Sequence, residues 1–246
     1  MNGLLVNSSY NIEGTHLLFA YEFDEIEHKR QLDLLAKSVE DIIGSTICED
    51  FNQLEATLAF YNYLSVNSTY LETGKLSKMD NAFDVLVNSR WVCRGFTSAL
   101  RYLLLQAGYD EGYSIYTRTQ ETPDAKLSAH IWNMLYINDN WYHFDLTWEN
   151  NWENKDAPDN QLYFFGLTDE ERADPTFVGE YEIWYGPDIP VPECTDDSFS
   201  PLHRGERFEL DLKNHAVYIM TETGKWLLWN TQDMTFTEID GPSFSS

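Results

Sequence analysis

The sequence predicts an α+β fold in which helices precede an antiparallel sheet and a small β-meander ends the chain. Three observations support this prediction. Between Phe96 and Ala107 the apolar residues recur at spacings of three and four, which is typical of one face of a helix. Between Ala129 and Trp148 strand-forming residues flank a short polar stretch, as in a β-hairpin. Residues 207–239 hold four short alternating segments separated by turn residues, as in a meander.

Three further helices are expected before this central helix. The second begins after Asp50, with Gln53 as its capping-box partner, and ends near Asn67. A short one is expected at residues 81–88. The first covers residues 24–43, and its apolar stripe consists of Ile26, Leu34, Leu35, Val39, Ile42 and Ile43.

The register of the hairpin decides which of its side chains share a face. With residues 138–139 as the two central positions of a primed turn, His130 faces Thr147 and Trp132 faces Asp145. Alternate residues project to the same side of a strand, so Asp145 becomes the diagonal neighbour of His130. A turn shifted by one residue would place Asp145 on the opposite face. The predicted contact between these two side chains therefore depends on the register.

Cys93, His130 and Asp145 are the candidate catalytic residues. A thiol, an imidazole and a carboxylate are the nucleophile, the base and the orienting group of acyl-transfer chemistry. The helical periodicity, which Gly108 ends, places Cys93 at or just before the first turn, where unpaired N–H groups and the helix dipole favour a thiolate. Taken singly, each residue type is more often structural. Their joint arrangement favours a functional triad.

Three motifs in this order resemble the transglutaminase-like superfamily of papain-related cysteine enzymes, in particular its bacterial members. Residues 92–96 read Val-Cys-Arg-Gly-Phe, residues 130–133 read His-Ile-Trp-Asn, and residues 141–148 read Trp-Tyr-His-Phe-Asp-Leu-Thr-Trp. The flanking segments 61–70 and 163–171 are also similar to those of bacterial members. The resemblance implies a papain/transglutaminase-like core in which the helix that carries the cysteine packs on an antiparallel sheet.

The resemblance also implies a reaction. It is cysteine-dependent acyl transfer on an amide of a peptide or protein, through a thioester, as peptidase-like hydrolysis or as transglutaminase-type transamidation. The backbone N–H of Cys93 is an expected oxyanion donor, and Tyr70 is a candidate for the second. Trp91 stands where a glycine is common, and Thr97 where an alanine is frequent. Trp91 and Trp132 are expected to border the cleft.

Two domains are expected: a catalytic domain at residues 1–185, which includes the N-terminal helices, and residues 186–246, a linker followed by the meander packed on that domain. With 41 acidic and 16 basic residues the formal charge is -25, which disfavours nucleic acid and anionic membranes as partners. The sequence indicates no cofactor and no metal site, because the cysteines and histidines lack metal-ligand spacing. Cys48 and Cys194 are interpreted as ordinary thiols without comparable partners.

Residues 1–20 lack both a basic leader and an unbroken apolar run. A cytoplasmic location is favoured, and secretion with a removed leader is the alternative; the oligomeric state is left open. For residues 149–160, which are rich in acidic groups, a solvated loop is the simpler interpretation and a calcium site the alternative. The alternative function is a catalytically silent module that binds peptides or proteins.

Overall fold

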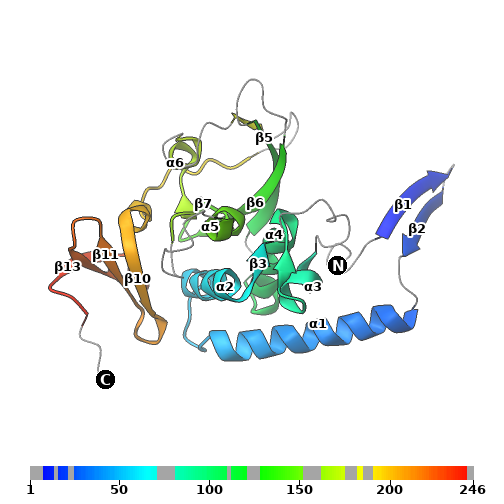
Figure 1. Cartoon of the computed structure of the whole chain (residues 1–246), viewed down its shortest axis with the longest axis horizontal. Coiled ribbons are helices and arrows are strands. Elements are labelled where there is room, and N and C mark those ends of the chain that lie inside the picture. The colour runs from blue at the N-terminus through cyan, green and yellow to red at the C-terminus, as the bar shows by residue number, and fades with distance from the viewer. Residues whose placement is uncertain are drawn as a thin grey trace.

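The structure is a computed structural model, which describes residues 8–13, 16–21, 25–70, 81–109, 112–120, 128–151, 162–174, 182–184 and 191–242 (Figure 1). It has the α+β fold expected from the sequence. Four helices precede the main sheet: α1 (Glu25–Thr46), α2 (Gln53–Asn67), α3 (Ala82–Leu86) and α4 (Cys93–Gln106). Two short helices lie between the later strands of that sheet, α5 (Leu146–Asn151) and α6 (Asp169–Ala173).

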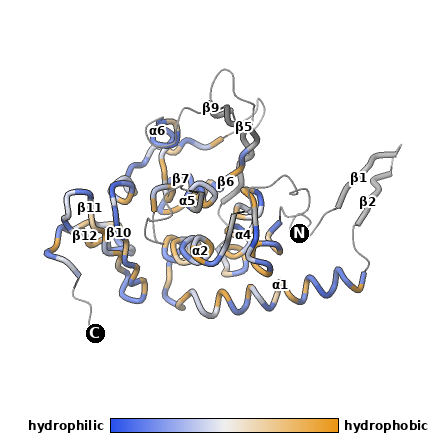
Figure 2. Tube along the Cα trace, viewed as in Figure 1, coloured by the Kyte–Doolittle hydropathy of each residue, from blue (hydrophilic) through white to orange (hydrophobic). Residues whose placement is uncertain are grey.

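The prediction for the first two helices is confirmed in extent and corrected in detail. Along α1 hydrophobic and hydrophilic residues interchange (Figure 2). Its buried positions are Gln31, Leu35, Val39 and Ile42. The predicted stripe is wrong for Ile26, which is 82% exposed, and for Leu34, which is 37% exposed. Helix α2 is capped by Asn52, whose side chain accepts from the N–H of Glu55, and not by the predicted Asp50 with Gln53.

The main sheet has five antiparallel strands in the order β8-β7-β6-β5-β9. Their bounds are β5 (Gly112–Gln120), β6 (Ser128–Ile137), β7 (Asn140–Phe144), β8 (Phe165–Leu167) and β9 (Glu182–Trp184). The predicted register of the hairpin is confirmed, because Ile137 pairs with Asn140 and Asn133 pairs with Phe144. Both turn residues, 138 and 139, have positive φ, as a primed turn requires.

Strand β7 ends earlier than the sequence predicts. The expected strand pairs of Asp145 with Trp132 and of Thr147 with His130 do not form, since helix α5 begins at Leu146. The backbone N–H of Asp145 donates to the carbonyl of Phe164 at 3.0 Å, so it does not continue the hairpin ladder. The Asp145 carboxylate accepts from the N–H of Trp148 at 3.2 Å, which caps the new helix.

Within the described residues before the main sheet, two smaller sheets are formed. Strands β1 (Ser8–Glu13) and β2 (His16–Tyr21) form an antiparallel pair. Strands β3 (Thr69–Tyr70) and β4 (Arg90–Trp91) are parallel and bring the segment after α2 beside the segment before α4.

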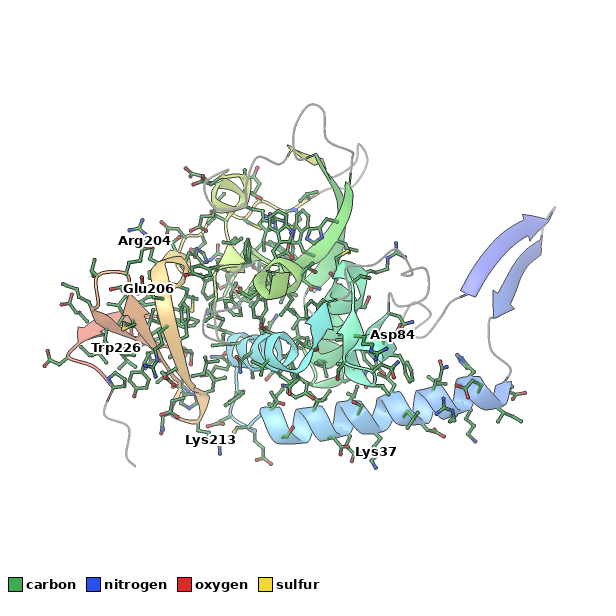
Figure 3. All side chains as sticks on the ribbon, viewed as in Figure 1. Lys37, Asp84, Arg204, Glu206, Lys213 and Trp226 are labelled. Carbon is green, nitrogen blue, oxygen red and sulfur yellow. The ribbon has the colours of Figure 1, made fainter. Side chains whose placement is uncertain are left out.

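The predicted meander is confirmed as a four-stranded antiparallel sheet at the C-terminal end of the described chain (Figure 1). Its strands are β10 (Gly205–Asp211), β11 (Ala216–Thr221), β12 (Trp226–Asn230) and β13 (Phe236–Ile239), with one-turn 3-10 helices η1 (Ser200–Arg204) and η2 (Leu212–Asn214). Figure 3 shows Arg204, Glu206, Lys213 and Trp226 around this sheet and Lys37 on the outer side of α1.

One hydrophobic core joins the helices, the main sheet and the meander. Leu100 and Leu103 of α4 belong to the same buried cluster as Val217 and Trp229 of the meander. The carboxylate of Glu55 adds a polar contact, since it accepts from Thr231 of the meander and from the Nδ1 of His215 at 2.7 Å. The division of the chain at residue 186 stays a prediction. Among the described residues, no helix combines the length and the apolar character needed to cross a membrane.

Candidate active site

Cys93 is the first residue of helix α4. Val92 before it has an extended backbone and provides no side-chain cap. The first N–H groups of an α-helix have no acceptor within that helix, and the helix dipole favours an anion there. Phe96 and Leu100, one and two turns further along α4, are buried and anchor the helix in the core. Cys93 is half-buried and is a free cysteine.

Two polar side chains join the first turn of α4 to strand β6. The hydroxyl of Thr97 lies 2.9 Å from the carbonyl oxygen of Cys93 and 3.1 Å from that of Ile131. The amide of Asn133 donates to the carbonyl of Thr97 at 3.0 Å. Because Ile131 follows His130 directly, these bonds hold the cysteine-bearing helix and the histidine-bearing strand together.

His130 lies between Cys93 and Asp145. Its Nε2 is 2.7 Å from the Oδ2 of Asp145, so Nε2 donates to the carboxylate and Nδ1 is the nitrogen that remains for the sulfur. The Cys93 side chain also interacts with His130, since it is among the causes that raise the pKa of the imidazole. The imidazole is 7% exposed and stacks on Trp148 with 8° between the ring planes. The structure therefore brings the three predicted catalytic side chains together; their role in catalysis stays a proposal.

Asp145 is completely buried and fully hydrogen-bonded. Its Oδ2 accepts from His130 and also from the Nη2 of Arg172 at 3.0 Å, while its Oδ1 accepts from the N–H of Trp148. A carboxylate can remain ionised in the protein interior when donors and cations surround it in this way. Asp145 is thus both the cap of α5 and the partner of the imidazole.

The partners of His130 determine its protonation. Burial by itself lowers the pKa of an imidazole, but the Asp145 carboxylate and the Cys93 side chain outweigh burial and raise the pKa of His130 to about 9. For Asp145, burial acts to raise the pKa, and His130, Arg172 and the N–H of Trp148 bring it below its ordinary value. At neutral pH the site therefore holds an imidazolium beside a carboxylate.

Of the oxyanion candidate Tyr70 and the two expected cleft residues Trp91 and Trp132, the structure describes the side chain of Trp132 and only the backbone of the other two. The backbone of Tyr70 pairs with that of Trp91, two residues before Cys93, in the parallel contact of β3 and β4. The side chains of Tyr70 and Trp91 lie outside the described part of the structure. Trp132 is 1% exposed, stacks near His130 and donates from Nε1 to the Nδ1 of His143 at 2.9 Å. The roles of these three residues in the cleft stay predictions.

A second buried carboxylate, Glu149 of α5, lies close to the first. It accepts from the hydroxyl of Tyr61 at 2.9 Å and from the N–H groups of Tyr163 and Phe164. Burial raises its pKa to about 8, although these three donors act in the opposite direction. Glu149 therefore fastens the segment before β8 to α2 and α5. The other acidic residues of the considered calcium loop lie outside the described residues.

The prediction that Cys194 has no comparable partners is wrong. Its sulfur, the carboxylate of Asp169 and the ring of His143 offer ligand atoms within 4.8 Å of one another. The Nε2 of His143 is 2.9 Å from the Oδ1 of Asp169, and the N–H of Cys194 donates to the Oδ2 of Asp169 at 2.8 Å. The three residues belong to segments far apart in the sequence, and no spacing pattern links them.

This second group does not fit a resident metal ion. A histidine that binds a metal normally donates from its other ring nitrogen. Here Trp132 donates to Nδ1 of His143, so the ring proton is on Nε2, where a metal would have to bind. Burial also raises the pKa of the Cys194 thiol, which favours the neutral form over the thiolate that binds metals. The group instead joins strand β7, helix α6 and the segment before η1.

The sequence did not indicate the contacts of Arg172 or the stacking of Trp148 on His130. The guanidinium of Arg172 lies over the rings of Trp132 and Trp148, at 4.4 Å and 3.8 Å from their centres. Nothing in the local sequence marks this arginine, which stands in the ordinary helical stretch after Thr168. Trp148 lies in a motif that the sequence had indicated, but its stacking on His130 follows from the turn of the chain into α5.

The comparison with family models agrees with the resemblance seen in the motifs. Residues 45–146 match the family model of the transglutaminase-like superfamily. No curated protein matches the sequence. Among solved structures, a TGase is 14% identical with a TM-score of 0.36, covering 57% of this chain and 43% of the other. A candidate cysteine protease from Cytophaga hutchinsonii is 15% identical with a TM-score of 0.34, covering 71% of this chain and 61% of the other. At such scores neither structure bears on the reaction.

Proposed function

We propose, from the premise that residues 45–146 carry a core of the transglutaminase-like superfamily, that this protein is a cysteine-dependent acyl-transfer enzyme that acts on amides. Cys93 is the nucleophile, His130 the acid and base, and Asp145 the orienting group. The observation that carries the proposal is the position of the buried His130, which bonds to Asp145 through Nε2 and interacts with the Cys93 side chain. This order of thiol, imidazole and carboxylate is that of a nucleophilic triad.

The first half of the reaction forms a thioester. The Cys93 sulfur, as a thiolate beside the imidazolium, attacks the carbonyl carbon of the amide and forms a tetrahedral oxyanion. We assign the stabilisation of this oxyanion to N–H groups at the start of α4, and the backbone N–H of Cys93 is the first candidate. His130 then gives its proton to the nitrogen as the C–N bond breaks. A free amine leaves, and the acyl group stays on the sulfur.

The second half releases the acyl group. A water molecule or a second amine loses a proton to the now neutral His130 and attacks the thioester carbonyl. The C–S bond breaks, and the thiolate and the imidazolium are restored. Water gives hydrolysis to a carboxylic acid, and an amine gives transamidation to a new amide. We favour hydrolysis of a peptide or protein amide, in line with the sequence-based expectation.

The decisive experiment combines labelling with turnover. Electrophilic mimics of peptide amides, read by mass spectrometry, identify which residue reacts and which substrate class is preferred. We expect label on Cys93 and none above background on Cys48, which is also half-buried and serves as an internal control. For a substrate found in this way, Cys93→Ala and His130→Ala should each abolish turnover, while Cys48→Ala should retain it.

The same experiment separates the proposal from the alternative of a silent binding module. Such a module would bind the peptide mimics, but iodoacetamide would alkylate Cys93 near pH 7 no faster than Cys48. Turnover that survives in a folded Cys93→Ala variant would contradict the assigned nucleophile. Turnover that survives in His130→Ala would contradict the assigned base.

A further inference from the structure

Arg172 is a buried cation at the centre of the site. Its side chain is completely buried, at the end of helix α6. The guanidinium lies over the indoles of both Trp132 and Trp148, and its Nη2 donates to the Oδ2 of Asp145 at 3.0 Å. A planar guanidinium suits both contacts, because it stacks on aromatic rings and bonds to a carboxylate in its own plane.

Arg172 and His130 share one oxygen atom. The Nε2 of His130 lies 2.7 Å from the Oδ2 of Asp145, and the Nη2 of Arg172 lies 3.0 Å from the same atom. The imidazolium and the guanidinium are therefore within about 6 Å of each other, a distance at which like charges influence ionisation. A change in the charge of Arg172 therefore alters the electrostatic potential at His130 and, through His130, at Cys93.

The position of Arg172 is determined by the anchors of helix α6. At its start Asp169 is held by His143 and by the N–H of Cys194. Two residues further on, Glu171 completes the capping box with Thr168 and is 3.0 Å from the Nδ1 of His203. The group of Cys194, His143 and Asp169 thus has a structural role, because it holds helix α6, which carries Arg172.

The charges of the site balance when Cys93 is a thiolate. Cys93 and Asp145 then carry one negative charge each, and His130 and Arg172 carry one positive charge each. Balanced charges matter here because an uncompensated charge in the protein interior is costly. Without the charge of Arg172 the same four positions would hold one net negative charge, which disfavours the thiolate.

Other titratable groups face the cluster from the neighbouring elements. Tyr61 of α2, His143 of β7 and Glu149 of α5 are buried around Asp145 and Arg172, and Asp169 of α6 pairs with His143. Burial raises the pKa of Tyr61, lowers that of His143 and raises that of Glu149 to about 8. These three groups are neutral near pH 7, so Asp145, Arg172 and the Cys93–His130 pair carry the charge at the centre of the site.

We propose that Arg172 is a positioning residue of this site, whose buried charge stabilises the Asp145 carboxylate and, through the Asp145–His130 pair, the reactive form of Cys93. The inference rests on the proposed triad. It assigns to Arg172 an electrostatic effect on the nucleophile in addition to packing. Removal of a nearby cation makes every anion less favourable, so Cys93 of a neutral variant should be alkylated more slowly at a given pH.

The test measures the rate of alkylation of Cys93 by iodoacetamide between pH 4.5 and pH 8, read on the Cys93 peptide by mass spectrometry. Arg172→Gln removes the charge and keeps a planar amide that can donate to Asp145. Arg172→Lys keeps the charge and loses the planar stack. For Arg172→Gln we expect the pH at which the alkylation rate increases to be about one unit higher than in the wild type. At a given pH in the range where the rate increases, the variant should therefore react about tenfold more slowly. The lysine variant should keep the wild-type profile, although both variants lose thermal stability.

Three outcomes decide the proposal. If a folded Arg172→Gln variant shows the wild-type pH dependence of alkylation, the electrostatic role of Arg172 is refuted and the proposed reaction remains intact. Equal shifts in the glutamine and lysine variants would reduce Arg172 to a packing role and overturn the proposal as well. A wild-type Cys93 that reacts no faster than Cys48 throughout would refute the triad itself.

If Arg172→Gln does not unfold cooperatively, Arg172→Met gives the same comparison. Arg207→Met, which removes an exposed cation paired with Glu209, should leave the profile unchanged.

Discussion

The buried carboxyl group of Glu149 predicts a pH dependence of stability that one substitution should remove. Glu149→Gln keeps the size and shape of the side chain, and its carbonyl can still accept from Tyr61 and Phe164, which bond to the same oxygen. The longer contact from the N–H of Tyr163, at 3.3 Å, is lost if the amide group occupies that side. At acid pH the variant should therefore be about 1 kcal/mol less stable than the wild type.

The magnitude follows from the pKa of Glu149, which burial raises from 4.5 to about 8. Between these values the folded state binds a proton that the unfolded state has released, so the free energy of unfolding falls as the pH rises. The contribution of the neutral carboxyl group is complete below pH 4.5 and is lost by pH 8. At 1.36 kcal/mol per pKa unit the loss is on the order of 5 kcal/mol. Glutamine does not titrate, so the variant should become the more stable protein near pH 8.

Urea unfolding followed by tryptophan fluorescence at pH 5, 6, 7 and 8 measures this difference. We expect the free energy of unfolding of wild type minus variant to change sign across the series. His130 also loses a stabilising contribution between pH 6.5 and about 9, since its folded pKa is raised, but that loss is common to both proteins and cancels. Glu206→Gln, at an exposed carboxylate, is the matched control (Figure 3). Parallel curves for wild type and Glu149→Gln would refute the reasoning.

Three further predictions concern the site and its frame. Asp145→Asn should lower kcat/KM on the order of 10³-fold, because a neutral amide no longer stabilises the charged form of His130; near wild-type kinetics would mean another orienting group. Thr97→Val should lower the free energy of unfolding by about 1 kcal/mol and slow alkylation of the nucleophile several-fold, and an unchanged alkylation rate would contradict the link between α4 and β6. Gly166→Ala should cost more than about 2 kcal/mol in urea unfolding, since its φ is +72° and a Cβ would lie 2.4 Å from the ring of Phe199; an unchanged urea midpoint would contradict that contact.

Local patterns predicted much of the frame of this molecule. The primed turn at residues 138–139 and the alternation beside it set the register of the hairpin, because both depend on neighbouring residues only. The start of α4 at Cys93 and its end before Gly108 were predictable for the same reason. Where two local signals competed, as at Asp50 and Asn52, the sequence pointed to the wrong cap.

The contact of Asp145 with His130 was predicted for a reason that the structure changes. Sequence periodicity placed Asp145 in a continuing strand, opposite Trp132. In the structure Asp145 leaves the hairpin, because its N–H bonds to the carbonyl of Phe164 in a segment that follows later in the chain. Its carboxylate still reaches Nε2 of His130 from the start of α5. The two side chains meet, but through a helix cap and not through a strand pair.

The sequence by itself thus determined the positions of Cys93 and His130 on a helix start and on a strand, since spacing, turns and caps act over a few residues. Only the tertiary structure decided what surrounds them. Arg172 reaches Asp145 across 27 positions, and Cys194 reaches Asp169 across 25, with no repeat or motif between them. Such contacts arise when separate elements pack against one core, and the burial that packing produces sets the charge of each group.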